Sequence, residues 1–97
     1  MVLTKRQINL YCMLMRQLRQ QIDQVDQELL KLLAKRQKLI LEISDLKKGE
    51  GLPVVDLKRE HEMRERLKIQ AEELELDPKF VDEFFQLILS ESHHLQA

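Results

Sequence analysis

Three basic residues in the first half of the chain have a spacing that could bind a small anion. Arg36 interrupts a series of apolar residues, and Lys47 follows it by eleven residues, about three helical turns or 16 Å. Two long side chains can reach one small ligand across that separation. Arg19 precedes Arg36 by seventeen residues, about 25 Å along a helix. If Arg19 serves the same ligand, it must therefore come from a second chain.

Each of these cations also has a purely structural interpretation. Arg36 could form a buried ion pair or specify the pairing of a coiled coil. Lys47 could complement the carbonyl end of a helix while remaining in solvent, and Arg19 could be an ordinary surface residue. Spacing alone leaves both interpretations open.

Polar residues near the middle and the end of the chain could complete such a site. Asp56 and Glu60 are one helical turn apart, with Arg59 between them, and two carboxylates so placed can hold a hydroxyl group. Ser92 and Gln96 have the same four-residue spacing. The alternatives are a helix cap for Asp56, a favourable helix-start charge for Glu60, and a frayed helix end for the last pair.

Other kinds of chemistry have no support in the sequence. His93 and His94 lack a further ligand at metal-binding spacing, and neither a phosphate-binding loop nor a Ser/His/Asp set occurs. We therefore expect no metal and no cofactor. The net charge is −1 with acids and bases interleaved, which argues against a nucleic-acid partner. No apolar run approaches the ~20 residues of a membrane span, and a single cysteine, Cys12, suits the cytoplasm.

Helices are expected to position all of these residues. Apolar residues follow a heptad pattern from Ile8 to Leu46 without Gly or Pro, which predicts a helix about 58 Å long. Gly49, Gly51 and Pro53 predict a loop. A second helix is expected from Asp56 to about Glu73, and a third from Pro78, with Asp77 as its N-cap, to near the C-terminus.

The apolar stripe of the third helix is predicted to include Phe80, Val81, Phe84, Phe85, Ile88 and Leu89 and to continue to Ser92 and Gln96. The fold is therefore all-α, with three helices in a single domain over residues 1–97. The first helix is too long for a compact chain of this size, whose radius of gyration would be ~13 Å. We expect two chains to bury their long helices in an intertwined homodimer.

Several segments together resemble the all-helical chorismate mutases. The first is Leu18–Asp26, continued by Leu29–Arg36, and Lys47 follows at the expected spacing. The later segments are Pro53–Glu60 and Phe85–Ile88, the latter leading to Ser92 and Gln96. The resemblance covers roughly residues 18–96. Residues 1–17 extend upstream in the same heptad phase and are expected to lengthen the first helix.

The resemblance implies a Claisen rearrangement of chorismate to prephenate, a shikimate-pathway step toward phenylalanine and tyrosine, without a cofactor. It implies that Arg19 from the partner chain and Arg36 bind the substrate's carboxylates. It also implies that Lys47 and Gln96 donate hydrogen bonds to the ether oxygen.

The same resemblance implies that Asp56 and Glu60 hold the ring hydroxyl, and that Arg59 and Ser92 complete the pocket. The expected catalytic residues are Arg36, Lys47, Glu60 and Gln96. A unimolecular reaction needs no nucleophile, but it needs a folded substrate conformer and stabilised charge on the ether oxygen.

Two other functions fit the same pattern. An isochorismate-pyruvate lyase, which makes salicylate, would share the fold, although Asp56 with Glu60 favours the mutase. A non-catalytic helical dimerisation module would explain the heptads but not the combination of Arg19, Arg36 and Lys47 with the later polar residues. The sequence does not distinguish a free-standing enzyme from one part of a bifunctional enzyme.

Overall fold

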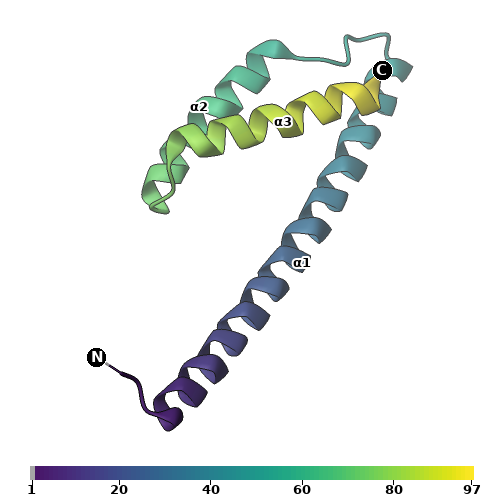
Figure 1. Ribbon diagram of the computed structural model, residues 1–97. Helices are drawn as coiled ribbons and strands as arrows, with labels where there is room; N and C mark the ends of the chain where they lie inside the picture. The colour runs from purple at the N-terminus through teal and green to yellow at the C-terminus, as the bar shows by residue number, and fades with distance from the viewer. Residues whose placement is uncertain (1) are drawn as a thin grey trace. The chain divides into compact units, whose positions relative to one another are not determined.

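The computed structural model describes residues 2–97, and three α-helices account for most of them (Figure 1). They are α1 (Lys5–Gly49), α2 (Leu57–Glu73) and α3 (Pro78–Gln96), and no strand occurs within the described range. The prediction of an all-α chain with a very long first helix is confirmed. Helix α1 includes residues 5–17 of the expected upstream extension, whereas Met1 lies outside the described residues. None of these helices is long and apolar enough to cross a membrane.

Helix α1 begins and ends at recognisable capping motifs. The Thr4 hydroxyl accepts from the Gln7 backbone N–H at 3.2 Å, and the Gln7 side chain accepts from the Thr4 N–H at 2.8 Å. At the other end, Leu52 N–H donates to Lys47 C=O at 2.8 Å and Gly51 N–H donates to Lys48 C=O at 3.2 Å. This pair of bonds is a Schellman motif, which requires the left-handed backbone that Gly51 adopts at φ 69°.

Helices α2 and α3 begin at the predicted caps. The Asp56 carboxylate accepts from Arg59 N–H at 3.0 Å, and Asp77 accepts from Lys79 N–H at the same distance. Pro78 follows Asp77 at the first helical position, where its missing N–H costs nothing. The predicted bounds of both helices are therefore confirmed to within one residue at each stated end.

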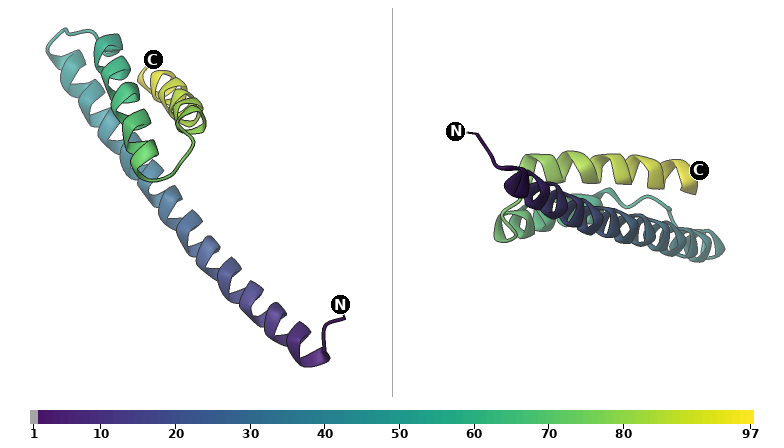
Figure 2. Two further views of the ribbon diagram at one scale, coloured as in Figure 1. Left: turned by 90° about the vertical axis from the view of Figure 1, so that its left-hand side faces the viewer. Right: turned by 60° about the horizontal axis from the view of Figure 1, so that its bottom comes forward.

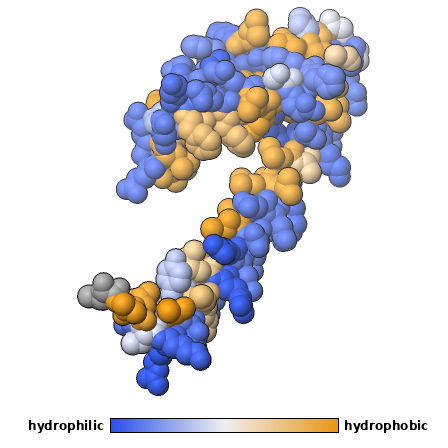
Figure 3. Space-filling view, viewed as in Figure 1, coloured by the Kyte–Doolittle hydropathy of each residue, from blue (hydrophilic) through white to orange (hydrophobic). Residues whose placement is uncertain are grey.

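The chain divides into two compact units, one ending at Arg36 and one spanning Gln37–Ala97. The first unit is the N-terminal part of α1, and its heptad residues are largely exposed: Tyr11 by 60%, Ile22 by 56% and Val25 by 58%. Figure 3 shows apolar side chains, in orange, recurring along this part of α1. The apolar series expected to be buried is therefore uncovered in a single chain.

In the second unit, α2 and α3 pack side by side and are connected by a short turn (Figure 2). Ala71 and Leu89 are its buried apolar residues, and the Arg64 guanidinium holds the Asp82 carboxylate through two bonds of 2.8 Å. Phe80 and Phe84, expected in the core, are 60% and 38% exposed. Their side of α3 is therefore not the side that packs most tightly within one chain.

The Schellman motif predicts opposite effects for alanine at the two glycines. Gly51→Ala should lower the free energy of unfolding by about 1 kcal/mol, because a Cβ is strained at positive φ even though the space around it is open. Gly49→Ala, inside the helix and equally open, is the matched control and should be neutral or slightly stabilising. Urea unfolding followed by circular dichroism measures both. Equal effects of the two substitutions would contradict the assignment.

The Arg64–Asp82 pair predicts an acid-dependent loss of stability. Hydrogen bonds from Arg64, and secondarily from Gln86, lower the pKa of Asp82 from 3.8 to about 2. The Asp82 carboxyl therefore binds a proton less readily in the folded protein than in the unfolded chain. The resulting stability is fully present above pH 3.8 and is lost as the pH falls toward about 2.

Asp82→Asn should remove the stability that this ion pair contributes. The difference in unfolding free energy between the wild type and the variant should therefore shrink as the pH falls from 3.8 toward about 2. Denaturant unfolding at several pH values tests this, with the exposed neighbour Glu83→Gln as control. A difference that stays constant down to pH 2 would show that the pair does not stabilise the fold in this way.

Candidate active site

Lys47 lies in the last turn of α1, at the edge of a small surface cavity. Its side chain is half-buried, and Nζ donates to the Val54 carbonyl at 3.3 Å. This bond ties the end of α1 to the loop that leads into α2. The cavity brings Lys47 together with Asp56, and its remaining walls are apolar: Leu52, Pro53, Val55 and Leu57.

Asp56 is the N-cap of α2, which is the structural role that the sequence pattern allowed as an alternative to substrate binding. Its Oδ1 accepts the Arg59 backbone N–H, while the residue as a whole remains exposed. The Arg59 side chain is also exposed. A capping carboxylate keeps a second oxygen, so the cap does not prevent Asp56 from accepting another hydrogen bond.

Glu60 lies on the side of α2 that faces α3. Its side chain is 21% exposed, and Oε1 is in hydrogen-bonding contact with Nε2 of His93 on α3. Arg64, one turn further along α2, has a pKa raised first by its hydrogen bond to Asp82 and, to a smaller extent, by the charge of Glu60. The contact with His93 places the Glu60 carboxylate at the interface between these helices.

Ser92 and Gln96 lie on the predicted continuation of the α3 stripe. Ser92 is 4% exposed, and its hydroxyl donates to the Ile88 carbonyl at 2.9 Å. Gln96 is half-buried and is the last residue of the helix. A frayed helix end is therefore the wrong interpretation of Ser92, since its side chain is buried within an ordered helix.

Two polar residues of the second unit occupy positions that the sequence patterns did not indicate. One is His93, whose partner Glu60 is 33 residues away, so no local pattern connects the two. The other is Ser44, one turn before Lys47 on α1. Ser44 is 1% exposed, and its Oγ has no hydrogen-bond partner among the described residues. A small polar side chain within the apolar series at Ile40 and Ile43 was the available clue.

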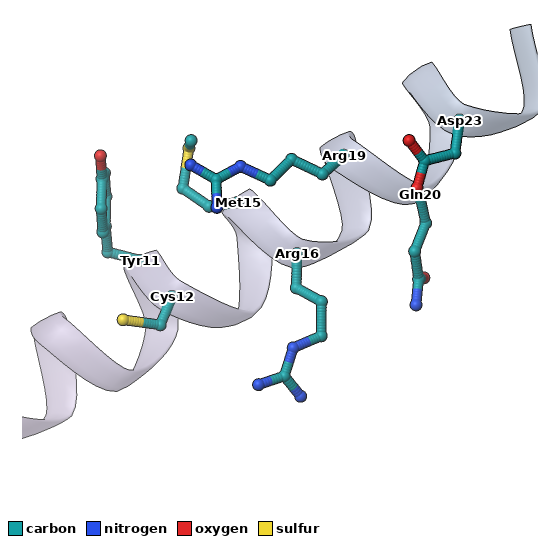
Figure 4. A pocket seen from close by; sticks show the side chains of 7 residues that line it. All are labelled: Tyr11, Cys12, Met15, Arg16, Arg19, Gln20 and Asp23. Carbon is teal, nitrogen blue, oxygen red and sulfur yellow. The ribbon is translucent and has the colours of Figure 1, made fainter. Parts of the chain in front are cut away.

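Arg19 and Arg36 belong to the first unit, whereas the other six candidates belong to the second. Arg36 is half-buried and Arg19 is exposed. Arg19 lies on the same side of α1 as Met15 and Tyr11, at intervals of four residues, in a shallow groove (Figure 4). All the side chains that line this groove come from one helix, so the groove is an open surface. No cluster of three metal-ligating side chains occurs among residues 2–97.

The chain is similar to several proteins with curated names. It is 38% identical to the T-protein of Enterobacter agglomerans, which covers 78% of this chain, and 37% identical to the bifunctional chorismate mutase/prephenate dehydratase of Escherichia coli K12, covering 77%. It spans only 20% and 19% of those two proteins. It is 29% identical to the chorismate mutase of Methanocaldococcus jannaschii, with 82% of this chain and 81% of that protein covered.

A family model described as chorismate mutase type II matches residues 18–97. The match includes every candidate residue, from Arg19 in the first unit to Gln96 at the end of α3. It begins where the resemblance begins, so the upstream part of α1 lies outside it. With more than three-quarters of its length matched, the chain belongs to the chorismate mutase type II family.

Proposed function

We propose that this protein converts chorismate to prephenate by an intramolecular Claisen rearrangement, a step in phenylalanine and tyrosine biosynthesis. The observation that carries the proposal is the match of the family to residues 18–97, which include all the expected polar groups. The conjunction of Lys47 and Asp56 in one cavity supports it. The single exposed thiol of Cys12 is compatible with a cytoplasmic location, which is part of the proposal.

Lys47 and Gln96 are the proposed donors to the ether oxygen of chorismate. Negative charge grows on this oxygen as its bond to the ring breaks, so donors already in place stabilise the transition state more than the substrate. Of the three Nζ donors of Lys47, one is used by the Val54 carbonyl and two are available. The half-burial of both side chains limits the competition from water.

Asp56 and Glu60 are the proposed acceptors for the ring hydroxyl. Each carboxylate already accepts one bond through a single oxygen, from Arg59 N–H and from His93 respectively. The second oxygen of each remains for substrate. Arg59 and Ser92 complete the pocket in this proposal, and no side chain has to act as a nucleophile because the reaction is unimolecular.

Arg19 and Arg36 are the proposed partners of the two substrate carboxylates, with Arg19 supplied by a second copy of the chain. The support for a homodimer is the uncovered apolar series of the first unit, which includes Leu18 beside Arg19. Burying a Leu or Ile side chain stabilises an assembly by about 1.5–3 kcal/mol. A second long helix of the same kind is a complementary surface for such a series.

The products formed from two substrates test the proposed activity. The purified protein should convert chorismate to prephenate and should release neither salicylate nor pyruvate from isochorismate. Chromatography with mass detection identifies the products. Salicylate with pyruvate would establish the lyase instead, and no turnover of either substrate would establish a non-catalytic module.

Mixed dimers test whether the site is shared between chains. Arg19→Ala and Arg36→Ala should each be inactive alone, because each homodimer lacks one cation in both sites. After subunit exchange, the mixed dimer has one intact site, so recovery of about a quarter of the wild-type activity is expected. Exchange is verified by native mass spectrometry. An inactive mixture that contains mixed dimers would rule out the contribution of Arg19 across the dimer.

A further inference from the structure

The contact between His93 on α3 and Glu60 on α2 joins two residues that are far apart in the sequence. An ionised carboxylate only accepts hydrogen bonds, so the His93 ring donates through Nε2 to Glu60 Oε1. The two side chains are 37% and 21% exposed. The imidazole therefore reaches the carboxylate at the margin of the helix interface, where both side chains remain partly accessible to solvent.

The packing of α2 against α3 fixes both members of the pair. Glu60 and Arg64 are one turn apart on α2, and Arg64 is bound to Asp82 on α3. His93 lies eleven residues, about three turns, beyond Asp82 and directly follows the buried Ser92. The His93 imidazole is therefore attached to a part of α3 that is held to α2 by the Arg64–Asp82 pair and contains the buried Ser92.

His93 constrains one oxygen of Glu60 and leaves the other available. A glutamate side chain has three rotatable bonds and loses conformational freedom when it binds a ligand. A neighbour that already holds Oε1 reduces this loss, because the carboxylate is oriented before substrate arrives. Oε2 can then accept the ring hydroxyl without a change in the Glu60 side chain.

We propose that His93 is a positioning residue that orients the Glu60 carboxylate to accept the substrate's ring hydroxyl. The inference rests on the proposed mutase function, which supplies the role of Glu60. His93 itself does not contact the substrate in this arrangement. Its contribution is a hydrogen bond at Nε2, so a side chain with a donor at the same distance from the backbone can replace it.

Three substitutions of His93 separate the hydrogen bond from simple packing. His93→Leu removes the donor. His93→Gln places an amide N–H close to the position of Nε2, whereas the shorter side chain in His93→Asn places it close to Nδ1, away from Glu60. His94→Leu is the matched control, because His94 is the exposed neighbour on the same helix.

The steady-state rearrangement of chorismate is measured for the wild type and these variants, with urea unfolding of each. His93→Leu and His93→Asn should lower kcat/KM by about tenfold, as for the loss of a hydrogen bond to a charged group. The loss should appear mainly as a higher KM, because the hydroxyl is bound in both the ground state and the transition state. His93→Gln should recover most of the activity, and His94→Leu should remain at the wild-type level.

Two results would overturn the inference while leaving the mutase function intact. One is wild-type kinetics for His93→Leu. The other is an equal loss for the Leu, Asn and Gln variants that follows their unfolding free energies, which indicates packing alone. A wild-type protein that does not convert chorismate refutes the proposed function itself, and with it the role given to His93.

Discussion

Very little apolar surface is buried when this chain folds alone, and that shortage constrains the rest of the molecule. Among residues 2–97, Ala71 and Leu89 are the apolar residues less than a tenth exposed. A helix as long as α1 is marginal without tertiary packing of its apolar face. The exposed series along its first unit, from Ile8 to Leu32, is therefore the surface that the proposed homodimer would bury. A shared site would then follow from the same packing that stabilises the helix.

Local signals in the sequence predicted the three helices and the starts of α2 and α3, but not the ends of α1, which runs from Lys5 to Gly49 although Gly49 was expected in the loop. Asp56 and Asp77 are good N-caps, and Gly51 provides the backbone conformation that ends α1. The start of α1 was predicted three residues late, because the capping pair of Thr4 and Gln7 was overlooked in favour of the first apolar residue. These features act over a few residues, so neighbouring sequence contains the information that specifies them.

The candidate site was predictable only in part, because its residues meet through packing. The α3 periodicity correctly extended the buried stripe to Ser92, and the position of Asp56 at the start of a helix indicated its cap. The pair of Glu60 and His93 had no local signal, since its geometry depends on how α2 crosses α3. Arg19 and Arg36 could be assigned roles only by resemblance, and those roles stay predictions.

The proposed chemistry suits a site whose polar groups are already engaged with the protein. A rearrangement within one molecule needs no group to form a bond with the substrate, so catalysis depends on how precisely donors and acceptors are oriented. Lys47, Asp56 and Glu60 each use part of their hydrogen-bonding capacity on a neighbour and keep the rest. Such partial engagement restricts a side chain before the ligand binds. In the proposed site, the three neighbours, Val54, Arg59 and His93, would reduce the entropy lost when the substrate is held.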